Sequence, residues 1–203
     1  MNDPGEIIVL NGAPRSGKTS IARVVQETFP GTWINLGVDV YMSATPAKLQ
    51  PGIGLRPGGE RPDLEPQIVS MYRALYDSVA AHTRNGISVV TDVGHHDWYS
   101  EPRGVLRDAA RRLDGLGAYL VGVRCPIDVI MRRRGAAGIP IPEPVQRWQD
   151  TVHDPGVYDL EVDTSQLSPE KCAAAIRARI AEGPPTAFAK LASNGPHRPL
   201  DEN

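Results

Sequence analysis

The sequence predicts an α/β fold in which a five-stranded parallel sheet carries helices on both faces. Three observations predict it. Short apolar runs alternate with segments of helical periodicity along most of the chain, as in parallel sheets with crossover helices. The first apolar run, 7–10, leads directly into a glycine-rich turn, 12–19. Two further runs lead to Asp39 and Asp92, and the carboxyl ends of parallel strands share one edge of a sheet.

The expected strands are short and rich in branched apolar residues. They are 7–10, 33–36, 87–91, 118–123 and 159–162. Apolar residues at helical spacing mark the segments between and after them as helices. The expected helices are 16–28, 64–84, 102–113, 127–134, 144–151 and 169–181. Asn85-Gly86 is a stop signal for the second helix and Ser168 an N-cap for the last one.

The chain of 203 residues predicts one domain over 1–182, followed by a disordered tail over 183–203 that is rich in proline and polar residues. The segment 44–66 is rich in proline and glycine and has almost no periodicity. We expect a long loop there, and such loops inside compact domains are usually functional. Two segments would therefore border a site: an acceptor loop at about 41–66 and a short lid at about 132–143.

Composition excludes several classes of protein. The net charge is −2 and no long block of like charge occurs, so we expect no nucleic-acid partner. No apolar run approaches the roughly 20 residues of a membrane span, and no signal-peptide pattern begins the chain. The two cysteines, Cys125 and Cys172, form no CxxC pair, which favours a reducing, cytoplasmic location. No heptad indicates an oligomer, although a homo-oligomer stays compatible with the sequence.

The glycine-rich turn has the spacing of the phosphate-binding loop of the P-loop NTPase fold. It consists of Gly12, Ala13, Pro14, Arg15, Ser16, Gly17, Lys18 and Thr19, with Ser20 next in the following helix. Backbone N–H groups and the helix N-terminus would hold the phosphates of ATP. Lys18 would reach the β- and γ-phosphates and support transfer, and the Thr19 hydroxyl would ligate Mg²⁺. Pro14 lacks an N–H and stiffens the loop. The alternative is a chance glycine-rich turn.

Two aspartates are candidates for the chemistry at this edge. Asp39 follows the second expected strand, where a carboxylate could orient an acceptor hydroxyl and take its proton. Asp92 ends an apolar strand, in the arrangement of a Walker-B carboxylate that holds Mg²⁺. The alternative role for each aspartate is a helix cap or turn residue.

Three consecutive arginines, Arg132, Arg133 and Arg134, precede a glycine-containing break. Arginines at that place could close over the triphosphate and stabilise charge in the transition state. The alternative is a solvated helix face on which Arg132 pairs with Asp128, four residues earlier.

The run 95–99 contains two histidines, an aspartate and two aromatic residues. Adjacent residues rarely reach one ion and Mg²⁺ prefers oxygen ligands, so a metal site is disfavoured and substrate contact or loop packing is favoured. Trp98, Tyr99, Tyr41 and Met42 would line an apolar acceptor pocket if the loops fold over the site. Each of them alone is more often a core residue.

The order of several short motifs resembles that of the chloramphenicol phosphotransferase-like kinases, small P-loop proteins related in fold to shikimate and nucleoside monophosphate kinases. Together with the phosphate-binding loop, the matching pieces are 8–12, 37–39, 89–92, 122–125, 152–153 and 158–164. They span most of the chain from residue 7 to residue 182.

The resemblance implies ATP-dependent O-phosphorylation of a small-molecule hydroxyl acceptor, with an antibiotic or related metabolite among the candidates. It implies that the loop residues serve phosphate and Mg²⁺ and that Asp39 is the general base. It further implies that Arg133 is a lid arginine and that Asp163 and Thr164 lie near the adenine.

The sequence departs from the family pattern in the lid, where 137–140 lacks the further arginine that the family carries. The role of that further lid arginine would then fall to Arg132 or Arg134, or the contribution of the lid to catalysis would be weaker. Two alternatives to a small-molecule kinase stay open. One is a nucleotide-binding regulatory module without phosphotransfer, and the other is a toxin-like or biosynthetic kinase acting on a nucleotide sugar.

Overall fold

The computed structural model describes residues 3–50, 61–96, 99–136, 138–154 and 156–193. Its centre is a five-stranded parallel sheet with strand order β2-β3-β1-β4-β5. The strands are β1 (Ile7–Asn11), β2 (Trp33–Asn35), β3 (Ser88–Val93), β4 (Ala118–Arg124) and β5 (Leu160–Asp163). Strand β1 lies between β3 and β4, so the segment that follows β1 emerges at the middle of the carboxyl edge.

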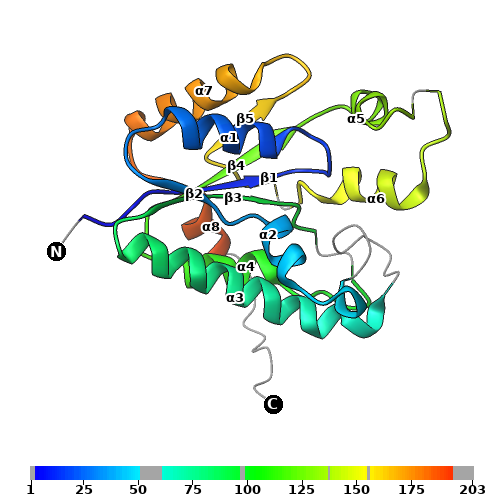
Figure 1. Ribbon diagram of the computed structural model, residues 1–203, viewed down its shortest axis with the longest axis horizontal. Helices are drawn as coiled ribbons and strands as arrows, with labels where there is room; N and C mark the ends of the chain where they lie inside the picture. The colour runs from blue at the N-terminus through cyan, green and yellow to red at the C-terminus, as the bar shows by residue number, and fades with distance from the viewer. Residues whose placement is uncertain (1–2, 51–60, 97–98, 137, 155, 194–203) are drawn as a thin grey trace.

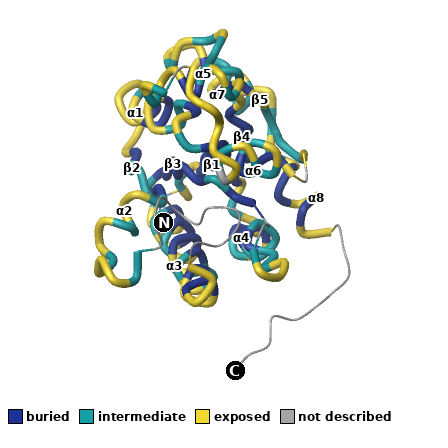
Figure 2. The backbone as a smooth tube through the Cα atoms, turned by 90° about the vertical axis from the view of Figure 1, so that its right-hand side faces the viewer, coloured by how far each residue is buried: buried dark blue, intermediate teal, exposed yellow. Residues whose placement is uncertain are grey.

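Helices cover both faces of the sheet, which confirms the predicted fold class (Figure 1). On one face lie α1 (Lys18–Thr28) and α7 (Pro169–Glu182). On the other face lie α3 (Glu65–Arg84), α4 (Val105–Arg112) and α8 (Ala187–Ser193). The strands are largely buried, while the outer sides of the helices are exposed (Figure 2).

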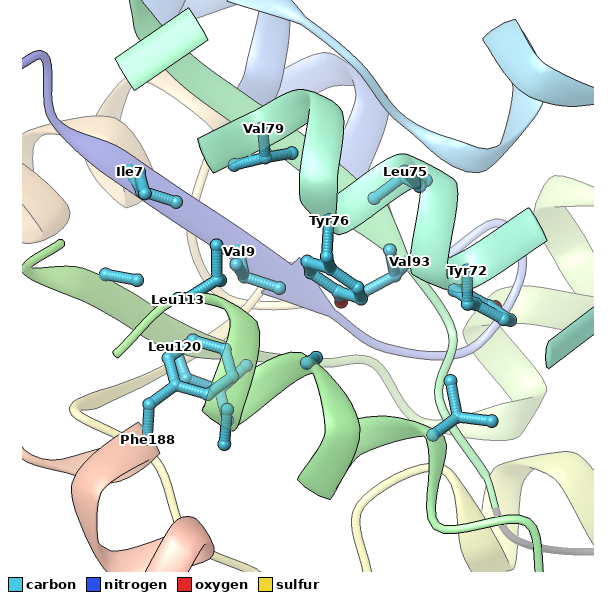
Figure 3. Packing of buried hydrophobic residues seen from close by; sticks show 14 of the residues in the cluster. Ile7, Val9, Tyr72, Leu75, Tyr76, Val79, Val93, Leu113, Leu120 and Phe188 are labelled. Atoms are coloured by element: carbon cyan, nitrogen blue, oxygen red, sulfur yellow. The ribbon is translucent and has the colours of Figure 1, made fainter. Parts of the chain in front are cut away.

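The core explains why the central strands are continuously apolar. All five residues of β1 are buried, because helices cover both faces of a parallel sheet. Beneath the sheet, Tyr76 and Val79 of α3 pack with Ile7, Val9 and Val93 (Figure 3). A second cluster on the opposite face joins the sheet to α1 and α7. These two layers hold the carboxyl edge of the sheet in a fixed frame.

The segment predicted as a long loop over 44–66 has more local structure than expected. A helix, α2 (Val38–Ala44), precedes it, and two short 3₁₀ helices lie at Ala47–Leu49 and Pro62–Leu64. Residues 51–60 lie outside the described part of the chain. Sequence periodicity could not reveal α2, because a helix of seven residues spans only two turns.

The lid segment predicted at about 132–143 begins in the last turn of α5 (Ile127–Arg133) and ends at the first residue of α6 (Glu143–Thr151). These bounds differ by one residue from the expected ones. The Ser168 cap of α7 is also present, since the Ser168 hydroxyl accepts a hydrogen bond from the Lys171 N–H at 3.4 Å.

The prediction of a disordered tail over 183–203 is wrong for 187–193, which form α8. Three apolar residues of α8 are buried against the sheet and α4. The Asp159 carboxylate, paired with Arg179 at 3.6 Å, accepts hydrogen bonds from the backbone at the start of this helix. A short apolar stripe and a distant cap therefore order the segment despite its prolines. Residues 194–203 lie outside the described part.

Candidate active site

The glycine-rich turn forms a loop between the end of β1 and the start of α1. Arg15 and Gly17 have φ angles of +64° and +98°, so the backbone curves into an N–H-lined concavity of the kind that binds anions. Gly17 caps α1 without a side-chain hydrogen bond. The N–H groups of Lys18, Thr19 and Ser20 have no intrahelical acceptor there. The loop is thus built to receive phosphate oxygens.

Close packing fixes the shape of the loop. A Cβ on Gly12 would lie 2.4 Å from the carbonyl oxygen of Val123, so no larger residue fits. Ala13 is buried and Pro14 is partly buried. The Ser16 hydroxyl is buried, and among the described residues it has no hydrogen-bond partner. Buried polar groups are normally satisfied, so this hydroxyl suits a ligand oxygen.

Lys18 folds back over the loop that carries it. Its Nζ donates hydrogen bonds to the carbonyl oxygens of Gly12 at 2.6 Å and Ala13 at 2.8 Å. Burial lowers the pKa of Lys18 to about 8, while the carboxylates of Asp92 and Asp39 act in the opposite direction. Both aspartates therefore lie within electrostatic reach of the ammonium group. The fold thus brings together Lys18, Asp39 and Asp92, which the sequence predicted as site residues.

Thr19 and Asp92 meet directly. The Thr19 hydroxyl donates to Asp92 Oδ2 at 2.7 Å. Asp92 is largely buried, and β3 extends one residue past it. A Cβ on Gly37 would lie 1.6 Å from Asp92 Oδ1, so a glycine after β2 makes room for this carboxylate. Hydroxyl and carboxylate oxygens are the ligands that Mg²⁺ prefers.

Asp39 lies in the first turn of α2 and is exposed. The helix cap is Gly37, so the structure does not give Asp39 the alternative role of a cap. The Asn35 side chain accepts a hydrogen bond from the Gly37 N–H at 2.8 Å. That contact turns the chain from β2 into α2 and directs Asp39 toward the same edge as the loop.

The structure separates the three arginines. The Arg133 guanidinium donates to the Thr164 carbonyl oxygen at 2.7 Å and reaches a carbonyl oxygen of the loop at 3.3 Å. Arg132 is exposed and pairs with Asp128 at 2.8 Å, as the alternative interpretation expected. Arg134 donates its backbone N–H to the end of α5. Of the three, Arg133 is the arginine placed at the phosphate-binding loop.

Thr164 and Asp163 have different surroundings. The Thr164 hydroxyl donates to the Ser16 carbonyl oxygen at 2.6 Å, and its methyl group lies beside Gly17. Asp163 Oδ1 instead accepts from the N–H of Ser165 at 2.8 Å and from its hydroxyl at 2.7 Å. Thr164 thus contacts the loop, whereas the Asp163 carboxylate stabilises the turn after β5.

The segment after β3 is buried rather than loosely placed. His95 and His96 are 3% and 4% exposed. The His96 ring stacks on Tyr99, with 4.7 Å between centroids, and meets Trp148 edge-on at 5.5 Å. The described residues hold no cluster of three metal-ligating side chains. Residues 97–98, predicted to contribute an aromatic wall through Trp98, lie outside the described part.

Tyr41 and Met42, the other predicted pocket residues, are partly buried on α2. The Tyr41 hydroxyl donates to the Ala74 carbonyl oxygen of α3 at 3.2 Å, and Tyr41 packs against the hydrophobic core cluster that includes α3. The Met42 carbonyl oxygen accepts from Gln50 at 2.9 Å. These contacts anchor α2, and a role in acceptor binding stays a prediction.

Sequence reasoning missed Asn11, the buried last residue of β1. Its Nδ2 donates to the carbonyl oxygen of Val152 at 2.7 Å and to the Tyr158 hydroxyl at 2.9 Å. Its Oδ1 accepts from the His95 N–H at 2.7 Å. A polar residue at the end of an apolar strand was the available signal. Its partners could not be identified from the sequence, because they lie far away along the chain.

Residues 5–181 match the family model described as "Chloramphenicol phosphotransferase-like protein". The chain belongs to this family. The match confirms the resemblance carried by the order of the short motifs. A Mycobacterium tuberculosis protein named "Putative O-phosphotransferase" is 27% identical over 177 residues, which cover 79% of this chain and 76% of that protein.

Solved structures of related shape show that this family member has the fold of P-loop kinases. A sugar kinase from a Janibacter species has a TM-score of 0.60 at 20% identity, covering 94% of this chain and all of that one. The tunicamycin resistance protein of Deinococcus radiodurans has a TM-score of 0.60 at 20% identity, covering 89% and 98%. Shikimate kinase from Acinetobacter baumannii has a TM-score of 0.59 at 14% identity, covering 89% and 95%.

The family and its relatives support phosphotransfer as the general activity. No helix within the described residues combines the length and the apolar character needed to cross a bilayer.

Proposed function

We propose that the protein is an ATP-dependent kinase that transfers the γ-phosphoryl group to a hydroxyl of a small molecule. The observation that carries the proposal is the meeting of four groups at one edge of the sheet. Lys18 covers the loop, Thr19 contacts Asp92, and Asp39 acts electrostatically on the same ammonium group. A protein that only binds a nucleotide has little use for an exposed carboxylate at that point.

The loop fits a triphosphate. The uncapped start of α1 and the unpartnered Ser16 hydroxyl supply donors within one concave turn. Lys18 can exchange its two carbonyl contacts for phosphate oxygens, which carry more negative charge. Arg133 and Thr164 border the outer side of the loop, where we expect the nucleoside part of ATP.

Thr19 and Asp92 would hold Mg²⁺, because the Thr19 hydroxyl oxygen and Asp92 Oδ2 lie 2.7 Å apart. When bound, Mg²⁺ supplies charge neutralisation at the β- and γ-phosphates. Gly37 keeps Asp92 in position by leaving space for its carboxylate.

Asp39 would act as the general base. Its carboxylate accepts the proton of the acceptor hydroxyl while the new O–P bond forms and the bond from the γ-phosphorus to the β,γ-bridging oxygen of ATP breaks. Lys18 would stabilise the charge that develops on the ADP side. The exposure of Asp39 leaves it open to an incoming acceptor.

Mass spectrometry of reaction mixtures tests the proposal. The enzyme is incubated with Mg²⁺-ATP and phenicols, aminoglycosides, macrolides, nucleosides and a metabolite extract. We expect one phosphorylated product, and its rate of formation should fall about 10²- to 10⁴-fold in Asp39→Asn, as for loss of a general base. The matched control is Asp77→Asn, an exposed carboxylate on α3 that pairs with Arg112.

The outcomes separate the alternatives. A phosphorylated nucleotide sugar from the extract would identify a biosynthetic or toxin-like kinase. ATP binding without any product, and without Asp39-dependent ATP hydrolysis, would contradict the kinase proposal and support a regulatory module. Cytoplasmic location agrees with the use of ATP and with the two free, buried cysteines.

A further inference from the structure

Two buried ring nitrogens without a hydrogen-bond partner among the described residues lie close to the segment that follows Asp92. One belongs to the His95 ring and the other to the Trp148 indole. Both side chains are more than nine-tenths buried, and neither His95 Nδ1 nor Trp148 Nε1 has a hydrogen-bond partner among the described residues. Leaving a buried donor unpaired costs roughly 1–3 kcal/mol. Two such donors at one edge of a site point to a ligand that satisfies them.

The His95 ring is held firmly. Its Nε2 lies 2.5 Å from the Tyr76 hydroxyl, and the ring packs on Tyr72 with 4.8 Å between centroids. Its backbone N–H is bound to Asn11. In Figure 3, Tyr72 and Tyr76 lie along α3 near Val93, the last residue of β3. Contacts with the middle of α3 therefore hold the His95 ring in place after β3.

The partner of His95 determines which nitrogen carries the proton. Burial lowers the pKa of His95 to about 3, so the ring is neutral at pH 7. Burial also raises the pKa of Tyr76 well above its ordinary value, so the hydroxyl keeps its proton. In the described part of the chain, His95 is the single partner of that hydroxyl. We infer that the Tyr76 hydroxyl, which has no other acceptor there, donates to Nε2, and the proton of the neutral ring is then on Nδ1 as a donor.

Trp148 approaches the same place from α6. A Cβ on Gly94 would lie 3.3 Å from Trp148 Nε1 and 3.2 Å from the Gly12 carbonyl oxygen. The indole nitrogen therefore lies over Gly94, which is next to the phosphate-binding loop and directly precedes His95 in the chain. Because Gly94 has no side chain, the buried indole edge can lie this close to the backbone at that point.

We propose that His95 Nδ1–H and Trp148 Nε1–H form an acceptor-binding subsite that donates hydrogen bonds to oxygen atoms of the acceptor. The inference rests on the proposed kinase function. Both donors are neutral groups that offer a hydrogen bond and no positive charge, so they suit uncharged oxygen atoms rather than an anionic group. The acceptor class is an uncharged hydroxyl compound with further oxygens, such as carbonyl, ether or hydroxyl groups, near the reacting hydroxyl.

Two substitutions remove one donor each and keep most of the packing. Trp148→Phe keeps an aromatic ring beside Gly94 and His96. His95→Gln retains a group near Nε2 for Tyr76 but has no donor at Nδ1. The matched control is Trp33→Phe, because the Trp33 N–H is already bound to the Pro30 carbonyl oxygen at 3.0 Å on β2. His95→Asn keeps an N–H near the Nδ1 position and serves as the conservative rescue.

The probe is the panel compound that yields product with the unmodified enzyme, chloramphenicol being the first tried. Each of the two variants is expected to raise the KM of that compound about tenfold, the effect of one lost hydrogen bond. The KM of ATP should change less than twofold. His95→Asn should recover most of the loss, and Trp33→Phe should match the parent enzyme.

An NMR titration gives a second readout that needs no variant kinetics. The indole N–H resonance of Trp148, assigned by its loss in Trp148→Phe, should shift when the same compound binds in the presence of a non-hydrolysable ATP analogue. An unchanged acceptor KM in either variant, or an unmoved resonance on binding, would overturn the subsite. If the unmodified enzyme forms no product with any compound, the proposed function itself has failed.

Discussion

The Thr19 hydroxyl donates to Asp92 Oδ2 across 2.7 Å and so joins the phosphate-binding loop to the adjacent strand β3. The two residues are 73 positions apart in the sequence. Because α1 begins at Lys18 and β3 is buried on both faces, neither partner can drift far from the other. The pair places a hydroxyl and a carboxylate oxygen where a hard cation would meet the phosphates.

Asp92→Asn should abolish most of the effect of Mg²⁺ on nucleotide binding. The substitution removes a negative charge close to the loop, so ATP without Mg²⁺ should bind as well as before or more tightly. Calorimetric titrations with and without Mg²⁺ measure both affinities. An Asp92→Asn variant that retains the full Mg²⁺ enhancement would exclude this carboxylate as a metal ligand.

ATP affinity should decrease at alkaline pH because of Lys18. Its pKa is about 8 without ligand, and the protonated form is the one that binds phosphate. As pH rises from 7 to 9 the charged fraction falls about tenfold, so the Kd of ATP should rise about tenfold. The Lys18→Ala variant is the control, because any remaining pH dependence belongs to the nucleotide or to other groups. Equal slopes in both proteins would show that Lys18 is not responsible.

Gly37→Ala should destabilise the protein and displace Asp92. The added methyl group would overlap Asp92 Oδ1 at 1.6 Å, and overpacking of this kind costs about 2 kcal/mol. Thermal unfolding measures the loss, and the Mg²⁺ dependence of ATP binding reports the displacement. Gly31→Asn is a suitable control: Gly31 has open space around it and a φ of +87°, which asparagine tolerates. Equal melting temperatures for the two variants would refute the clash.

Asp159→Ala should release α8 from the sheet. The fully buried carboxylate accepts hydrogen bonds from the N–H groups of Leu120, Thr186 and Ala187 and pairs with Arg179. Its removal leaves buried donors and a cation without their partner, which should cost about 3 kcal/mol.

Urea unfolding measures this cost, and limited proteolysis detects the released C-terminal segment. The exposed Asp154, five residues earlier, provides the control Asp154→Ala. If Asp159→Ala and Asp154→Ala unfold at the same urea concentration, the carboxylate does not hold the segment.

Local patterns in the sequence were sufficient for the sheet and for the phosphate-binding loop. The apolar composition of a run such as Ile7–Asn11 predicts a buried strand, and the glycine spacing after it predicts the phosphate-binding loop. The Arg132–Asp128 pair was also predictable, because a spacing of four residues defines neighbours on a helix.

Other parts depend on contacts between distant segments. The Asp159 carboxylate accepts hydrogen bonds at the start of α8, and no local pattern in the sequence shows that it lies there. The sequence indicates only that Trp148 is a helical residue, because its contact with Gly94 depends on the fold. The distinction between Arg132 and Arg133 likewise needs Thr164, which lies 31 residues beyond Arg133.

The three contacts of Asn11 tie the end of β1 to distant parts of the chain. They join residues separated by 84, 141 and 147 positions, and contacts of such separation form late because closing large loops costs entropy. A nascent chain that has emerged only as far as α5 has the complete phosphate-binding loop but lacks Val152 and Tyr158. Two of the three contacts that fix the end of β1, directly before the phosphate-binding loop, can therefore form only after most of the polypeptide has been synthesised.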